Sequence, residues 1–311
     1  SINNNTISGS TGNGISIFSC AINNLIGVTT ANNITGNAGY GLSITNANGN
    51  QISNNTFSTN TLGGILISNS AGIVTGNTIS GNTGLGVTLV GGTGSQISNN
   101  TIKTNSGGGI SLSNGGGNLT GNIITGNSGF GISIKTSTGN QIANNTVGTN
   151  TFGGISISNS TGRLTENTIT QNQGYGLLLN TANNNTISGN TVSGNFGLGI
   201  FDTTGTGNQI TNNIIGANTL GGISFKNSTG HITGNTINSN LAFGILLSSS
   251  SGNTVNGNTI SGNSTDGLVI SGNNNVLSNN NITGNSGLGI TASVSTGNQF
   301  TNNVVETNTL G

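Results

Sequence analysis

The sequence predicts an all-β protein, a right-handed parallel β-helix of about 13 to 14 coils with 22 to 23 residues and three short strands in each coil. Three observations predict this fold. An apolar residue recurs at that period, asparagine recurs at two fixed positions of the coil, and glycine recurs at a third. A fixed period of this length is typical of solenoids, in which each repeat packs on the next. We expect residues 1–311 to form one continuous β-solenoid, as a segment of a longer chain or a filament protomer.

The apolar anchor sets the length of each coil. Counted from the anchor as position 0, further apolar residues recur at positions 5, 13 and 15. The last two have the two-residue period of a strand with one buried face. Spacings of 22 and 23 alternate along most of the chain, so that two coils form a superrepeat of 45 residues. The anchors are Ile52, Val74, Ile97, Leu119, Ile142, Leu164, Ile187, Ile210, Ile232, Val255, Leu277 and Phe300.

Asparagine recurs at positions 3 and 8 of the coil, and these columns are predicted to form two stacked ladders at two corners. An asparagine turned inward can bond to the backbone of the turn and pass a hydrogen bond to the asparagine one coil away, about 4.8 Å along the axis. The first ladder includes Asn55, Asn77, Asn100, Asn122, Asn145, Asn167, Asn190 and Asn213. The second includes Asn60, Asn82, Asn105, Asn127, Asn150, Asn172, Asn195 and Asn218.

Glycine at position 12, as at Gly64 and Gly86, is predicted to mark the third corner. A fixed glycine just before a strand indicates either a positive φ or a backbone approach too close for a Cβ.

Charged side chains make up 3% of the chain, against about 25% in an average globular domain. The four basic residues are scattered singly at Lys103, Lys135, Arg163 and Lys226. Nucleic acid is therefore not an expected partner, because phosphate binding requires clustered basic residues. No apolar stretch approaches the roughly 20 residues of a membrane-spanning helix, so no membrane insertion is expected. The single Cys20 excludes an internal disulfide framework.

Candidate catalytic and metal-binding residues do not cluster in the predicted coils. Glycoside hydrolysis requires two carboxyl groups within about 5 to 10 Å. The four acids, Glu166, Asp202, Asp266 and Glu306, fall at different positions of separate coils. His231 has no second His or Cys with which to share a metal. We therefore expect no catalytic residue, no metal site and no cofactor, and predict that the chain is not an enzyme.

Two further positions bear on sugar binding and burial. Asp202 occupies position 15, which is otherwise apolar, and we expect a local bulge that turns Phe201 inward rather than a buried acid. Tyr40 and Tyr175 occupy position 11, which Leu85 and other apolar residues share. This sharing indicates corner packing rather than a platform for sugar rings.

The complete motif I-x-x-N-x-I-x-x-N-x-x-x-G-I-x-I runs from Ile97 to Leu112 and resembles the repeats of parallel β-helix proteins of the pectate-lyase-like superfamily. The pattern is similar to that of periplasmic copper-binding and carbohydrate-binding β-helix proteins. The resemblance implies a right-handed solenoid of three sheets in a carbohydrate-rich or extracellular setting. It transfers no catalytic residue to this chain.

These observations favour an extracellular or cell-surface structural or adhesive rod, or a filament subunit, without catalytic activity. Its partners would be further copies of itself, end to end or laterally, or surface glycans. One alternative is a polysaccharide-binding β-helix. Another is an ice-binding or lattice-binding face formed by Thr and Ser at positions 4 and 6, as at Thr78 and Ser80, although Lys103 and Ile123 interrupt that array.

Overall fold

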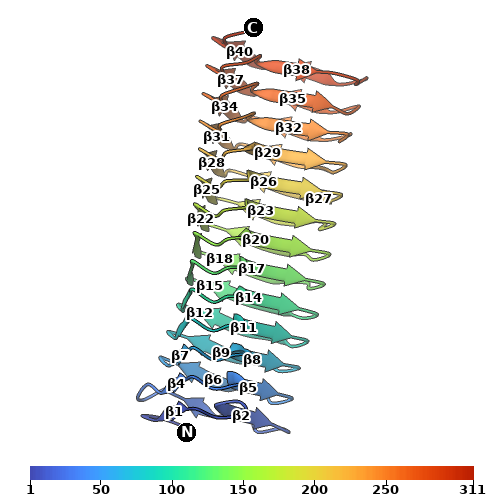
Figure 1. Cartoon of the computed structure of the whole chain (residues 1–311). Coiled ribbons are helices and arrows are strands. Elements are labelled where there is room, and N and C mark those ends of the chain that lie inside the picture. Colours follow the sequence, from blue (N-terminus) through green and yellow to red (C-terminus); the bar gives the residue numbers. More distant parts are fainter. The chain divides into compact units, whose positions relative to one another are not determined.

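The computed structural model describes all residues 1–311 and contains 40 strands and no helix. No helix is therefore available to span a membrane. The strands form three parallel sheets, and the chain divides into two compact units, Ser1–Phe152 (unit 1) and Gly153–Gly311 (unit 2). Each unit is a β-solenoid of the predicted class, so the predicted fold class is confirmed (Figure 1). That residues 1–311 form a single continuous solenoid stays a prediction.

Each coil of unit 1 contributes a strand to each sheet in turn. Sheet B contains β1 (Thr6–Ser8), β4 (Asn33–Thr35), β7 (Thr56–Ser58), β10 (Thr78–Ser80), β13 (Thr101–Lys103), β16 (Ile123–Thr125) and β19 (Thr146–Gly148). Sheet C contains β2 (Ile15–Phe18), β5 (Tyr40–Thr45), β8 (Gly63–Ser68), β11 (Leu85–Val90), β14 (Gly108–Ser113) and β17 (Phe130–Lys135). Sheet A contains β3 (Leu25–Ile26), β6 (Asn50–Ser53), β9 (Gly72–Thr75), β12 (Thr93–Ser98), β15 (Gly116–Thr120) and β18 (Asn140–Ala143).

Unit 2 repeats this arrangement. Its sheet C strands are β20 (Gly153–Ser158), β23 (Tyr175–Asn180), β26 (Leu198–Thr203), β29 (Gly221–Lys226), β32 (Ile245–Ser248), β35 (Leu268–Ser271) and β38 (Ile290–Ala292). Its sheet A strands are β21 (Gly162–Thr165), β24 (Thr186–Ser188), β27 (Thr206–Thr211), β30 (Thr229–Thr233), β33 (Thr254–Asn256), β36 (Val276–Ser278) and β39 (Gln299–Thr301). Its sheet B strands are β22 (Thr168–Thr170), β25 (Thr191–Ser193), β28 (Ile214–Gly216), β31 (Thr236–Asn238), β34 (Thr259–Ser261), β37 (Asn281–Thr283) and β40 (Val304–Glu306).

The register places like residues over one another. In sheet A, Ile52 pairs with Val74 and Val74 pairs with Ile97, and all three side chains are fully buried. The anchors therefore form a continuous apolar column inside each unit. A single coil buries too few apolar side chains to offset the conformational entropy that it loses, so stability comes from stacking.

The asparagine ladders lie at the two predicted corners. Asn100 donates from its backbone N and from Nδ2 to Oδ1 of Asn122, at 3.0 Å in each case. Its Nδ2 also donates to the carbonyl of Val74 at 2.9 Å. Asn105 and Asn127 of the second ladder are joined in the same way. Both ladders recur in unit 2, so the prediction of two ladders is confirmed.

A third asparagine ladder lies at the corner between sheets C and A and was not predicted. It is shorter than the other two: Asn253 donates to Asn275, and Asn275 donates to Asn298. Glycine or serine occupies the same column in other coils, as at Gly72 and Ser95. The sequence therefore shows no constant residue there.

Glycine at position 12 is required by close packing. A Cβ on Gly86 would lie 2.6 Å from Cγ2 of Ile102 and 2.8 Å from the carbonyl oxygen of Gly109. The φ of Gly86 is not positive. Of the two predicted reasons for this glycine, the close approach of the next coil is therefore the one that applies.

Candidate functional site

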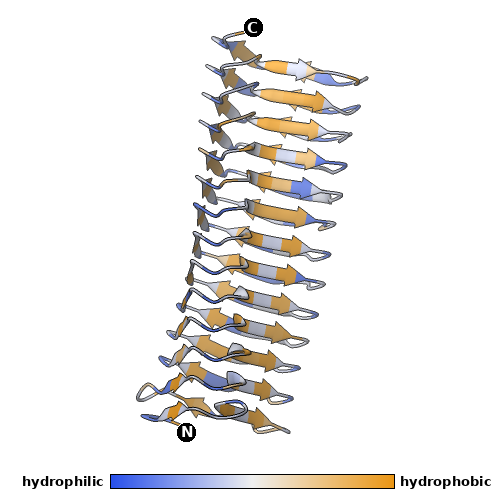
Figure 2. Cartoon of the chain, in the orientation of Figure 1, coloured by the Kyte–Doolittle hydropathy of each residue, from blue (hydrophilic) through white to orange (hydrophobic).

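The outward face of sheet C differs between the two units. In most of its strands, position 14 lies between two buried positions and points outward, and in unit 1 it is mostly Ser or Thr, as at Ser43 and Thr88. In unit 2 the residues at this position, in register from β23 to β35, are Leu178, Phe201, Ser224, Leu246 and Val269. Figure 2 shows β23, β32 and β35 as hydrophobic along most of their length. Unit 2 therefore carries an apolar outer face.

A shallow groove of about 320 Å³ lies on this face. We call it the sheet C groove. Its lining residues are Tyr175, Leu198, Phe201, Leu220, Ser224, Lys226, Phe243, Leu246 and Ser248. They come from β23, β26, β29 and β32 and from the turns that precede these strands.

Three aromatic rings form the apolar part of the groove. The rings of Tyr175 and Phe201 have centroids 5.2 Å apart and are tilted by 44°. Both are half-buried, as is Phe243, and Leu220 beside them is 53% exposed. The expectation that Tyr175 serves only corner packing does not describe this arrangement, because its ring packs against an outward-facing aromatic side chain. These rings present apolar surface to solvent within a single groove.

Gly221 fixes the position of the Phe243 ring. A Cβ on Gly221 would lie 2.7 Å from Cε2 of Phe243, so the ring covers the glycine backbone. Gly221 also has a φ of 128°, which side chains rarely adopt. The ring therefore rests against backbone, which limits its movement.

The polar part of the groove is small. Ser224 lies between Phe201 and Leu246 in the register of sheet C and is buried. Lys226 and Ser248 stand at the carboxyl ends of β29 and β32, and Lys226 is exposed. The groove thus combines aromatic walls with the hydroxyls of Tyr175 and Ser248, the buried hydroxyl of Ser224 and one ammonium group.

Asp202 is buried, and the expected bulge is absent. The register runs without a break from Leu179 to Asp202 and on to Phe225, so Phe201 points outward and Asp202 inward. The Asp202 side chain is fully buried. The expectation was wrong because the interior supplies polar partners: Nδ2 of Asn208 donates to Oδ2 at 2.8 Å, and Oγ of Ser228 donates to Oδ1 at 3.3 Å.

Burial raises the pKa of Asp202 to about 6, although the hydrogen bonds from Asn208, Ser228 and the backbone of Gly205 act in the opposite direction. Asn185 donates to Asn208 in the corner ladder, but the next coil places Gly230 opposite Asn208. The carboxyl group of Asp202 therefore accepts a hydrogen bond from Nδ2 of Asn208, which has no asparagine opposite it in the next coil. This role is structural.

The other three acids lie apart from Asp202 and from one another. Glu166 is exposed in the turn before β22, and Glu306 is exposed at the end of β40. Asp266 precedes β35, where Oδ1 accepts a hydrogen bond from the backbone N of Leu288 at 2.9 Å and Oδ2 accepts one from Oγ1 of Thr291 at 2.7 Å. These positions bring no two carboxylates together on adjacent coils of one sheet.

His231 is exposed in β30, and no three His, Cys, Asp or Glu side chains form a cluster that could hold a metal.

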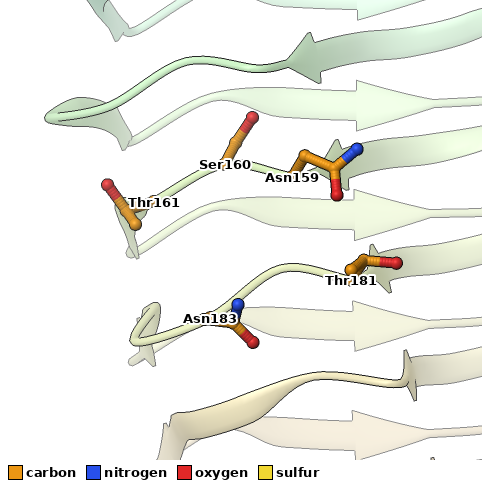
Figure 3. Close-up of a pocket in the computed structure, with 5 residues that line it drawn as sticks. All are labelled: Asn159, Ser160, Thr161, Thr181 and Asn183. Atoms are coloured by element: carbon orange, nitrogen blue, oxygen red, sulfur yellow. The ribbon is translucent and has the colours of Figure 1, made fainter.

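A second pocket lies between two turns at the corner of sheets C and A and has a volume of about 240 Å³ (Figure 3). It is lined by Asn159, Ser160, Thr161, Thr181 and Asn183. Two of these side chains bond to the next coil. Oδ1 of Asn183 accepts from N and Oγ1 of Thr206 at 2.8 and 2.9 Å, and Oγ1 of Thr181 is 3.2 Å from Oγ1 of Thr204. These hydroxyl and amide groups hold neighbouring turns together, so we favour the sheet C groove as the functional site.

The stacked coils and three parallel sheets in each unit define a parallel β-helix protein. The chain belongs to the family described as right handed beta helix region, which matches residues 1–147 and 153–306. Among curated proteins, none matches the sequence.

Several solved structures share the fold at low sequence identity. Tailspike protein 2 of the Escherichia coli O157:H7 bacteriophage CAB120 is 17% identical, with a TM-score of 0.58 over 73% of this chain and 38% of that one. A mutant of the periplasmic alginate epimerase AlgG is 15% identical, with a TM-score of 0.60 over 90% of this chain and 76% of that one. A thermostable α-1,3-glucanase from Streptomyces thermodiastaticus is 16% identical, with a TM-score of 0.62 over 91% of this chain and 63% of its catalytic unit. The chain thus spans little more than a third of the tailspike.

These comparisons correct the functional prediction from sequence. We expected a structural or adhesive rod without catalytic activity and a chain that is not an enzyme. The solved structures that share its fold include an epimerase and a glucanase whose names state polysaccharide substrates. The polysaccharide-binding alternative fits these neighbours better than the rod does. Roles as a filament or adhesin are not confirmed.

Proposed function

We propose that this chain is a polysaccharide-binding β-helix and that the sheet C groove of unit 2 binds the glycan. The observation that carries this proposal is that three aromatic side chains, Tyr175, Phe201 and Phe243, line one groove on the outer face of sheet C. Sugar rings have apolar C–H faces that pack on aromatic rings, and their hydroxyls require hydrogen-bond partners. A binding site for such a ligand is mostly apolar with a few placed polar groups, which is the composition of this groove.

The direction of the groove suits a polymer. Its lining residues come from strands that pair side by side, so the groove crosses β23, β26, β29 and β32 from coil to coil. A glycan lying across these strands would meet apolar side chains in successive coils about 4.8 Å apart. The half-buried Ser248 at the end of β32 lies among these side chains, and its hydroxyl can bond to the sugar.

Two features of the comparisons support a carbohydrate-related role. The alginate epimerase and the α-1,3-glucanase are named for polysaccharides, and the tailspike belongs to a phage particle. The epimerase is also named as periplasmic, in keeping with our prediction of an extracellular or cell-surface location. The four acids of this chain form no pair suited to glycoside hydrolysis, so our proposal concerns binding. Self-association and the ice-binding alternative stay predictions.

Binding can be tested with two polysaccharides that differ in charge and linkage. Soluble alginate is presented in affinity gel electrophoresis, and insoluble α-1,3-glucan is presented in a sedimentation assay. We expect the intact chain to bind at least one of them, and Phe201→Ala to weaken that binding about tenfold, because it removes the groove ring that packs on Tyr175. Leu66→Ala is the matched control, since Leu66 occupies the same outward position in unit 1.

The control should bind as well as the unchanged chain. If the unchanged chain binds neither polysaccharide, the proposal is overturned. Equal binding by Phe201→Ala and Leu66→Ala would also overturn it.

A further inference from the structure

Lys226 is the only charged residue among those that line the sheet C groove. It is the last residue of β29, and its side chain is exposed. Its strand neighbour Phe225 is fully buried, and Ser224 lies on the same outward face two residues earlier. The ammonium group therefore stands at the edge of the aromatic surface.

No acid of the chain neutralises this ammonium group. Asp202 lies on the adjacent strand but points into the core, where Asn208 and Ser228 bond to it. Both oxygens of Asp266 accept hydrogen bonds from the following coil, at Leu288 and Thr291. Glu166 and Glu306 lie in the turn before β22 and at the end of β40, away from the groove. Lys226 is thus a cation without a salt-bridge partner.

We infer that the groove prefers a polysaccharide with negatively charged groups, such as the carboxylates of uronic acids, and that Lys226 determines this preference. This inference rests on the proposed function. A carboxylate on the bound glycan would accept a charge-assisted hydrogen bond from Nζ of Lys226, which is stronger than a hydrogen bond between neutral groups.

The net charge of the chain supports a local origin for the preference. With four basic and four acidic residues, the formal net charge is zero, so no long-range field attracts an anionic polymer. Discrimination between charged and neutral glycans must come from a cation at the site. Charged groups at interfaces contribute to specificity more than to total affinity, so the neutral glycan should still bind through the aromatic rings.

Lys135 provides a matched control. It is the last residue of β17 and has the same place in its sheet C strand as Lys226 has in β29, but it belongs to unit 1. Both lysines are exposed. Replacing either lysine by glutamine changes the net charge of the chain by the same amount, so any difference between the variants reports the position of the charge.

The experiment compares alginate with carboxyl-reduced alginate of the same length, in which each carboxylate has become a hydroxymethyl group. Dissociation constants are measured by calorimetry at low and at moderate salt. We expect the unchanged chain and Lys135→Gln to bind alginate about tenfold more tightly than the reduced polymer, with the preference decreasing as salt increases. We expect Lys226→Gln to bind the two polymers equally.

A preference that survives in Lys226→Gln would overturn the inference, as would an equal loss in Lys135→Gln. If the unchanged chain binds both polymers equally and Phe201→Ala weakens both, the charge preference is refuted and the proposed function stands. If the unchanged chain binds neither polymer nor α-1,3-glucan, the proposed function itself fails.

Discussion

Phe201 and Asp202 are consecutive residues of β26 whose side chains point to opposite faces of sheet C. The ring of Phe201 packs on Tyr175 at the surface, while the carboxyl group of Asp202 is fully buried beside Asn208. The two-residue period of the strand imposes this opposition. One coil thereby supplies both an aromatic ring of the proposed binding groove and the carboxyl group that accepts a hydrogen bond from Asn208 of the corner ladder.

The buried carboxyl group makes stability depend on pH. The pKa of Asp202 is about 6 in the folded chain, against an ordinary value of 3.8, so the folded state binds more protons than the unfolded state between these pH values. The free energy of unfolding should therefore fall by up to about 3 kcal/mol as pH rises from about 4 to about 6, and stay low above that. Urea unfolding at several pH values measures this. Asp202→Asn should abolish the step, whereas Glu166→Gln, at an exposed acid, should retain it. A step of equal size in Asp202→Asn would contradict the assignment to this residue.

The ladder residue Asn100 should be far less tolerant of substitution than an exposed asparagine. Its Oδ1 accepts from both N and Nδ2 of Asn77, and its own Nδ2 donates to Val74. Asn100→Ala leaves these buried groups without partners, at about 1 to 3 kcal/mol each, so the expected loss of stability is about 3 kcal/mol or more. Asn118→Ala makes the same chemical change at an exposed position and should cost under about 0.5 kcal/mol. Denaturant midpoints distinguish the two variants, and equal midpoints would refute the contribution to stability that we assign to the ladder.

The repeat predicted the fold because the same requirement recurs in every coil. Asn100 and Asn122 must meet wherever the backbone turns that corner, so both residues are asparagine and the period is visible. The groove follows from residues that break the repeat. Phe201 occupies an outward position, where packing does not restrict the type of side chain. The residues at this position in other coils therefore give no indication of a site.

The burial of Asp202, at an inward position, could likewise not be predicted from the repeat. Its position is apolar in most coils, and its burial is possible only because Asn208 and Ser228 face it from other parts of the chain. These partners reach its carboxyl group only in the folded chain. Residues that repeat were therefore predictable from the sequence, whereas contacts made by a single exceptional coil were not.

Gly221 should be needed for binding as well as for folding. Gly221→Ala places a methyl group 2.7 Å from Phe243 and occupies a φ of 128°, so we expect a loss of stability of about 1 to 3 kcal/mol and a displaced ring. Gly252→Ala is the control, because Gly252 also has a positive φ, of 70°, but no atom within 4 Å of the added Cβ. Both variants should lose stability in denaturant, but only Gly221→Ala should also lose affinity for alginate or α-1,3-glucan. The control carries backbone strain without touching a ring, so it separates the effect of strain from the effect of displacing Phe243. Unchanged glycan affinity in a folded Gly221→Ala variant would show that glycan binding does not depend on the position of the Phe243 ring.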